Sequence, residues 1–241
     1  MKRILIAAAA FSAAITAARA ADFVVIESSV AALQPGARIS SGAKLSVPAL
    51  GRVVLMSADG SVVPFNGPFD GAVPAGKGGA GDSQVLALLP AIFNPAVRTE
   101  AGAVRAAGVG WRKETVKSVA DVLTVNASDG GDTCLAGTAG VEVMHDPTHS
   151  GGMTVHAADG DAAAKLEWRP RMVRQPWPAA LPLADGKTYM FEQQGLPSMA
   201  LATIHILPAA KSDAERVTQL AKAGCTDQAR LLLAVLAKNA R

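Results

Sequence analysis

Short hydrophobic runs, many of them β-branched, alternate with turn residues in the part of the chain that follows residue 20. Asp59-Gly60 separates two of these runs, and glycine accepts the positive φ that a tight hairpin turn requires. Runs of this length between turn signals are typical of β-strands. The pattern therefore predicts a small β-module over residues 21–75, with strands at 23–26, 37–39, 44–47, 52–56 and 61–65.

A second set of short hydrophobic runs, punctuated by Asp-Gly pairs, occupies residues 111–208. Several short strands with such turns favour a larger antiparallel β-sandwich over a parallel sheet wound with helices. The predicted strands lie at 122–125, 133–135, 141–144, 153–156, 165–168, 188–191 and 200–207. We expect the large aromatic side chains to fill its core, with a carbohydrate-stacking surface as the alternative interpretation. They are Trp111, Trp168, Trp177, Tyr189 and Phe191.

The hydrophobic period changes to that of helices at residues 209–241. Ser212 and Glu215 have the spacing of a capping box, and the helix they begin should stop near Gly224. Thr226 is predicted to cap a second helix through about Lys238. Two helices of this length are not stable alone, so we expect the hairpin to dock on the β-domain through an apolar face. That face comprises Leu231, Leu232, Val235 and Leu236.

Residues 76–110 begin with glycine-rich sequence and predict a linker that contains one short helix. We expect this helix to cover about residues 84–89 and to end by Pro90, because proline lacks the N–H that continues a helix. The whole pattern predicts a mainly β protein. It combines a small N-terminal β-module, a larger antiparallel β-sandwich and a C-terminal α-helical hairpin.

The first twenty residues have the pattern of a cleavable secretory signal peptide. Lys2 and Arg3 precede an uncharged apolar run, and Ala18-Arg19-Ala20 has the small residues that signal peptidase requires. We expect cleavage between Ala20 and Ala21 and a periplasmic location. No later stretch is long and apolar enough to span a bilayer, so we expect no membrane insertion after cleavage.

The distribution of charge argues against a nucleic-acid partner. Three of the 23 basic residues and none of the 20 acidic residues lie in the signal segment, so the remainder is formally neutral with 20 of each. No basic cluster is present elsewhere in the sequence, and nucleic-acid binding depends on one.

Cys134 and Cys225 are the two cysteines of the chain. An even number of cysteines in an exported protein predicts a disulfide, because the compartment is oxidising. Closing a loop of about 90 residues stabilises a fold by roughly 4 to 5 kcal/mol in the loop-entropy model. The bridge would attach the helical hairpin to the β-domain.

Two stretches resemble known groups of proteins. Leu33-x-Pro35-Gly36-x-x-Ile39-x-x-Gly42-x-x-Leu45, followed by Val53-x-Leu55 and Asp59-Gly60-Ser61, resembles the periplasmic β-module of FecR-type proteins, although Ala37 replaces an acidic residue frequent in that family. The resemblance implies a sensing or scaffold module. FecR proteins relay a signal across the inner membrane, and this chain lacks the transmembrane helix for that relay.

The second resemblance covers most of the second half of the chain. Trp177-Pro178-x-x-Leu181-Pro182-x-x-Asp185-Gly186-x-x-Tyr189 and Gly224-Cys225-x-x-Gln228-Ala229 resemble uncharacterised exported bacterial proteins. This resemblance implies no particular chemistry and assigns no cofactor.

One turn concentrates residues that can ligate metals. Imidazole and thioether groups together suit copper, and imidazole with Asp146 suits zinc. The candidate ligands are Met144, His145, His149, Met153 and His156. Strand alternation places Met144 and His145 on opposite faces, and Met153 and His156 likewise. An exposed polar hairpin tip is the alternative interpretation of the same residues.

A serine hydrolase is a further hypothesis. Asp146, His149 and Ser150 contain the groups of a catalytic triad, and Ser150 or Ser198 would be the nucleophile. The chain has no Gly-x-Ser-x-Gly elbow to expose such a serine. We expect His205 to be a half-buried histidine on the face of a strand.

These observations favour a non-catalytic periplasmic binding or adaptor protein that acts with another protein of the cell envelope. We expect no cofactor, and the sequence identifies no small-molecule ligand. Metal handling through the histidine and methionine turn and hydrolysis are the alternatives.

Overall fold

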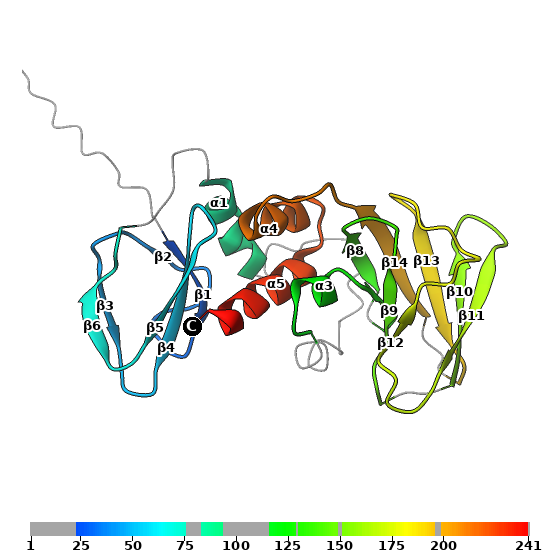
Figure 1. Ribbon diagram of the computed structural model, residues 1–241, viewed down its shortest axis with the longest axis horizontal. Coiled ribbons are helices and arrows are strands. Elements are labelled where there is room, and N and C mark those ends of the chain that lie inside the picture. The colour runs from blue at the N-terminus through cyan, green and yellow to red at the C-terminus, as the bar shows by residue number, and fades with distance from the viewer. Residues whose placement is uncertain are drawn as a thin grey trace, which may run out of the picture.

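The computed structural model describes residues 23–75, 83–93, 116–128, 130–148, 151–195 and 199–240. The predicted signal peptide, the glycine-rich stretch 76–81 and Trp111 lie outside these residues. The described part is mainly β and ends in a pair of helices, as the hydrophobic pattern predicts. Figure 1 shows two β-units with a group of helices between them.

The first β-unit contains two antiparallel sheets. The larger has the order β2-β1-β4-β5, and the smaller pairs β3 with β6. A hydrophobic cluster that includes Phe23, Leu45 and Phe65 fills the space between them. The strands are β1 (Phe23–Ser28), β2 (Arg38–Ile39), β3 (Lys44–Val47), β4 (Arg52–Ser57), β5 (Val62–Asn66) and β6 (Phe69–Ala72).

The predicted Asp59-Gly60 turn joins β4 to β5, and Gly60 has a φ of 85°. The Asp59 carboxylate accepts hydrogen bonds from the Ser57 hydroxyl and from the Ser61 N–H. Burial opposes ionisation of Asp59, but these hydrogen bonds outweigh it and lower its pKa. A Cβ at Gly60 would lie 2.6 Å from the Cβ of Ala214, so the turn packs directly on the C-terminal helices.

The second β-unit has a five-stranded sheet and a three-stranded sheet, in the orders β11-β10-β13-β14-β8 and β12-β9-β7. One hydrophobic cluster takes residues from both sheets, among them Val143, Phe191 and Ile204, which gives the unit a sandwich-like core. Most ladders are antiparallel, and the β14–β8 and β7–β9 ladders are parallel. The strands are β7 (Val125–Asn126), β8 (Gly131–Leu135), β9 (Glu142–Met144), β10 (Gly151–Ala157), β11 (Ala163–Trp168), β12 (Arg174–Pro176), β13 (Thr188–Gln193) and β14 (Met199–Ile206).

The strand predicted at residues 122–125 is partly wrong, because a short helix, α3 (Val119–Val122), precedes β7. Ser118 and Asp121 form a capping box that begins this helix. Asp121 also pairs with Arg174 on β12. Burial opposes ionisation of Asp121, but hydrogen bonds from Arg174 and from the N–H groups of Lys117 and Ser118 lower its pKa to about 2.

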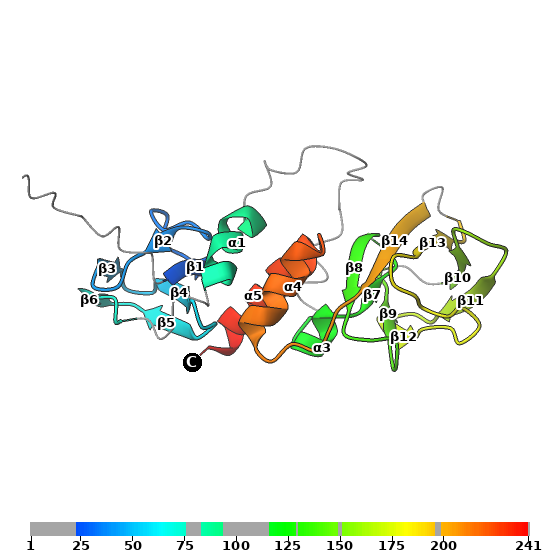
Figure 2. The same ribbon diagram turned by 90° about the horizontal axis from the view of Figure 1, so that it is seen from above.

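In both views, α3 and three longer helices lie between the two β-units (Figures 1 and 2), and the longer helices pack on one another. They are α1 (Ser83–Phe93), α4 (Asp213–Lys222) and α5 (Thr226–Asn239). Their buried residues share one cluster with Val24 and Val54 of the first β-unit and with Cys134 and Met144 of the second. The hairpin was expected to dock on the β-sandwich alone, and this expectation is too narrow. Its apolar surface is wide enough to bury a face of the β1–β4 sheet as well.

Helix α1 continues through Pro90 to Phe93, so the prediction that it ends by Pro90 is wrong. Proline leaves the carbonyl four residues earlier without its usual partner. That carbonyl belongs to Leu86, and it accepts a hydrogen bond of 3.4 Å from the Arg38 guanidinium. At the helix end, the Ile92 carbonyl accepts from Arg230 of α5. A distant arginine therefore compensates for the hydrogen bond lost at Pro90, and a second one caps the end of the helix.

The two C-terminal helices begin almost as predicted. The Ser212 hydroxyl accepts from the Glu215 N–H at 3.2 Å, and Gly224, with a φ of 83°, follows the end of α4. Cys225, not Thr226, occupies the N-cap position of α5. Thr226 is the first helical residue, and its hydroxyl donates to the Gly224 carbonyl.

Candidate functional site

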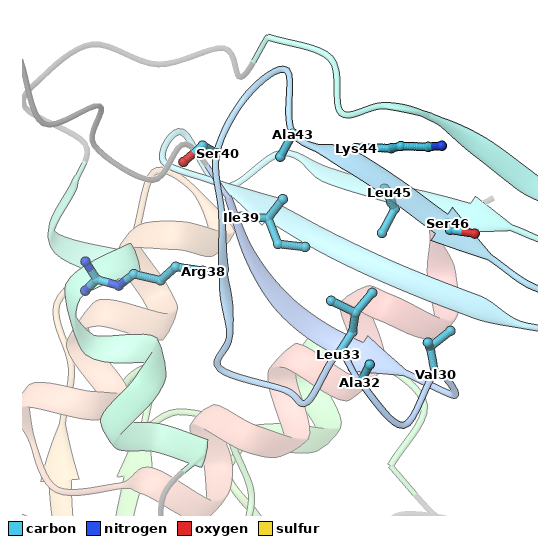
Figure 3. Close-up of a pocket in the computed structure, with 10 residues that line it drawn as sticks. All are labelled: Val30, Ala32, Leu33, Arg38, Ile39, Ser40, Ala43, Lys44, Leu45 and Ser46. Atoms are coloured by element: carbon cyan, nitrogen blue, oxygen red, sulfur yellow. The ribbon is translucent and has the colours of Figure 1, made fainter.

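A groove of about 380 Å³ opens on the surface of the first β-unit, between β2 and β3 (Figure 3). Leu33, Ile39 and Leu45 give it an apolar floor, with Val30 from the same loop as Leu33 at one end. Serine and lysine side chains from β3 and the turn before it lie at its margin. The groove is therefore an open, shallow apolar surface with a polar edge.

Strand edges border the groove on both sides. Within the described residues, β2 is the last strand of its sheet and β3 pairs only with β6. On the β6 side, the Ala43 carbonyl accepts from the Val73 N–H at 2.9 Å. Peptide groups alternate in direction along a strand, so those of Lys44 and Ser46 face away from β6. No strand in the described part of the chain pairs with this side of β3.

The charges near the groove are already engaged. Arg38 points away from it toward α1 in Figure 3, where it binds the Leu86 carbonyl. Lys44 Nζ lies 3.2 Å from Asp70 Oδ1 in an exposed ion pair. Both charged side chains of the groove lining are therefore paired, and an exposed ion pair such as Lys44–Asp70 contributes little energy.

The structure separates the residues of the histidine and methionine turn. Met144 is buried in the cluster around the helices, whereas Met153 is buried in the core of the second β-unit. The His145 ring is buried and stacks on Trp168, with centroids 4.7 Å apart, and its Nε2 lies 3.2 Å from Gln193 Oε1. Among the members of this set that the structure describes, His156 alone lies on the outer side of the sheet, where its Nε2 is 3.5 Å from Glu192 Oε2.

The remaining member of that set, His149, lies outside the described residues. Within the part that the structure describes, no three histidine, cysteine, aspartate or glutamate side chains are grouped to hold a metal ion. The candidate metal ligands that the structure describes are close in sequence, but they lie in three separate environments.

The residues of the hydrolase hypothesis are only partly described. Ser150 and Ser198 lie outside the described residues, as does His149. Asp146 is engaged in its own turn, where its Oδ1 accepts from the N–H and the hydroxyl of Thr148. His205 is half-buried on β14, as expected from its place in the sequence, and its Nε2 lies 2.9 Å from Asp132 Oδ1.

A covalent and polar connection attaches α5 to the edge strand β8. The Sγ atoms of Cys134 and Cys225 are 2.07 Å apart, so the two cysteines form the predicted disulfide. The Gln228 side chain is buried beside them. Its Oε1 accepts from the Cys134 N–H at 2.6 Å, and its Nε2 donates to the Cys134 carbonyl at 2.9 Å and to the Val122 carbonyl. The side-chain amide of Gln228 therefore makes the hydrogen bonds to Cys134 that a neighbouring strand would make at this edge of the sheet.

Two residues that sequence reasoning gave no role fix the ends of α5. Gln228 could have been noticed as a polar residue on an apolar helix face three positions after a cysteine. Arg52 of β4 donates to the Ala237 and Ala240 carbonyls at 2.8 and 2.9 Å, which caps the C-terminal end. No local signal in the sequence points to Arg52, because its partners are more than 180 residues away.

No family model, curated protein or solved structure matches this chain. The resemblance to FecR-type modules stays a prediction. In the described part of the chain, none of the helices has the length and apolar character that crossing a bilayer requires. A functional proposal must therefore rest on the geometry of the molecule itself.

Proposed function

We propose that this chain is a non-catalytic periplasmic binding or adaptor protein, which takes up an extended segment of another cell-envelope protein in the groove between β2 and β3. The observation that carries the proposal is the groove itself, an apolar floor bordered by two strand edges. The signal-like first twenty residues support export, as does the paired state of both cysteines.

Binding of this kind is β-augmentation, in which an extended peptide adds a strand to a sheet edge. Main-chain hydrogen bonds with Lys44 and Ser46 would supply affinity. Alternate side chains of the peptide would point toward Leu33, Ile39 and Leu45, which would supply selectivity for apolar residues. β3 has four residues, so the segment in contact with it is short.

The rest of the molecule suits a scaffold. The disulfide and Gln228 connect α5 to the second β-unit, and Arg52 connects the same helix to the first. A protein held in this way presents the groove at a fixed position relative to the second β-unit. The resemblance to FecR-type modules, which implies a scaffold or sensing role, agrees with this proposal.

In-cell photocrosslinking tests the proposal. A photoreactive residue placed at Ser46, at the groove margin, should capture one reproducible envelope protein, identified by mass spectrometry. The same residue at Thr138, an exposed loop position in the second β-unit, is the positional control and should not capture that protein.

A groove-filling variant gives a matched comparison. Ala32 lines the groove and is exposed, so Ala32→Trp should obstruct it without disturbing the core, and the crosslink from position 46 should fall at least fivefold. Ala139→Trp places the same indole at an exposed site elsewhere and should leave the crosslink unchanged. An undiminished crosslink in Ala32→Trp, or the same products from positions 46 and 138, would refute the proposal.

A further inference from the structure

We infer that the outer face of the five-stranded sheet binds a soft monovalent metal ion, Cu(I) or Ag(I), through His156, Met190 and Met199. The three residues lie on β10, β13 and β14, which are adjacent in the sheet. Only His156 belongs to the turn that suggested copper in the sequence. The methionines come from strands 34 and 43 positions later in the chain.

Strand alternation fixes the face on which these side chains lie. In each strand the intervening residues are buried in the core of the second β-unit, so His156, Met190 and Met199 project from the opposite side. The buried neighbours are Met153, Val155, Tyr189, Phe191, Ala202 and Ile204. Met199 is 56% exposed and the His156 side chain is 32% exposed, so an ion has access to this face from solvent, although the Nε2 atom of His156 is itself covered and has no hydrogen-bond partner among the described residues.

The strand register brings the donors into one patch. His156 is the direct cross-strand partner of Met190. Met199 is the partner of Glu192, two residues along β13 from Met190. Direct partners have Cβ atoms about 5 Å apart, and diagonal neighbours remain within reach of long side chains. Met190 thus lies between the histidine and the second methionine.

The position of the imidazole supports convergence. His156 Nε2 lies 3.5 Å from Glu192 Oε2, although Glu192 is a diagonal neighbour and not the direct partner. The imidazole and this carboxylate therefore meet between β10 and β13, beside the row that contains Met199. The Glu192 carboxylate also brings a negative charge to the place where a cation would sit, and this charge favours binding.

The donor set selects the class of metal. Thioether sulfur and imidazole are soft or borderline ligands, which favour Cu(I) and Ag(I) over Mg²⁺ or Ca²⁺. Thiolate would compete strongly, but both cysteines of the chain are in the disulfide. Met56, Met144 and Met153 are buried and therefore withdrawn from metal. Met190 and Met199 are thus the thioethers on an open sheet face within the described residues.

An apolar contact surface is the competing explanation, since Leu201, the partner of Met190, is also 53% exposed. Leucine in place of methionine separates the two explanations. Met190→Leu with Met199→Leu keeps the apolar area of the face and removes both sulfur atoms. A metal site is lost in this variant, whereas an apolar contact surface is retained.

The test is titration of the purified, disulfide-intact protein with Ag(I), followed by NMR of methionine ε-methyl groups labelled with ¹³C. The Met190 and Met199 signals should shift together and saturate at one equivalent, while the signal of partly buried Met172 should not move. Competition with bicinchoninate should then report the affinity for Cu(I). Shifts spread over all methionines would mean non-specific association and would overturn the inference.

Variants locate the site and supply controls. The Met190→Leu/Met199→Leu double variant and His156→Ala should each weaken Ag(I) binding at least tenfold. Met172→Leu and His205→Ala remove one thioether and one imidazole elsewhere and should leave binding unchanged. Wild-type binding by either of the first two variants would refute the assignment. Ala32→Trp should also bind Ag(I) normally, so the metal site and the proposed groove can fail independently.

Discussion

The two β-units bury their strands in different ways. In the first unit, Val25 and Leu55 face the core of the module, whereas Val24 and Val54 on the same strands face the helices. Strands β1 and β4 are therefore covered on both faces. In the second unit, β10 and β13 bury one face in the sandwich and leave the other to solvent. Burial of both faces of β1 and β4 stabilises the fold, whereas the open face of β10 and β13 is accessible to a ligand.

The hydrophobic pattern of the strands in the sequence reflects this difference. Phe23-Val24-Val25-Ile26 and Val53-Val54-Leu55-Met56 are continuous hydrophobic runs, whereas Met153-Thr154-Val155-His156 of β10 alternates between apolar and polar residues. A continuous run indicates a strand covered on both faces, and alternation indicates one open face. The helices that cover β1 and β4 are therefore part of the core of the first unit, although α5 follows β1 by about 200 residues in the chain.

The largest expected effect comes from placing a charge on the covered face. Val54→Asp buries a carboxylate against the helices without a partner and should lower the free energy of unfolding by about 5 kcal/mol or more. Thr154→Asp introduces the same group on the open face of β10, between Lys165 on one side and Glu192 on the other, and should change stability by less than about 1 kcal/mol because the two charges oppose each other. Urea unfolding of the two variants measures the contrast, and equal losses would contradict it.

Removing the disulfide should have the next largest effect. Replacing Cys134 and Cys225 together by alanine frees a loop of 91 residues and should lower the free energy of unfolding by about 4 kcal/mol. Because the bridge lies between α5 and β8, hydrogen exchange should increase first along these two elements. Faster exchange confined to β3 and β6 would argue against this view of how the units are joined.

Gln228→Leu tests the polar part of the same connection. Leucine keeps the volume but leaves the N–H and carbonyl of Cys134 buried without hydrogen-bond partners, which should cost about 2 kcal/mol. Gln219→Leu, on the less buried helix α4, should change the free energy of unfolding by less than about 0.5 kcal/mol and serves as the control. A Gln228→Leu protein as stable as the wild type would show that solvent satisfies the edge of β8.

The smallest effect depends on pH. Hydrogen bonds lower the pKa of Asp121 from 3.8 to about 2, so its ionised form stabilises the fold at pH values above about 4. This contribution, up to about 2 kcal/mol, should be lost as the pH falls from 4 to 2. The stability difference between wild type and Asp121→Asn, measured by urea unfolding, should shrink over that interval. A difference that stays constant would contradict the assignment.

Much of the local structure is predictable from neighbouring residues. The Asp59-Gly60 hairpin, the Ser212 cap and the β-rich character of both units depend on signals a few residues long, and each is present in the structure. The pairing of Cys134 with Cys225 follows because the chain has two cysteines. The residues that determine the turn, the cap and the strands are adjacent in the sequence, so these features can be predicted from short segments.

The candidate sites could not be predicted in the same way. Proximity in sequence suggested a metal site in the turn around His149, but strand alternation and packing send Met144 and Met153 into different cores. The patch of His156, Met190 and Met199 exists only because β10, β13 and β14 are adjacent in the sheet. The groove likewise forms only because the loop around Leu33 comes close to β2 and β3, which belong to different sheets.

Short-range signals therefore specify the strands, turns and helix starts of this protein, since steric and hydrogen-bonding preferences act over a few residues. The passage of α1 through Pro90, the burial of both faces of β1 and the roles of Arg52 and Gln228 depend on partners that are remote in sequence. Hydrophobic burial is not directional, so the register of the sheets and the fit of the helices decide which remote residues meet.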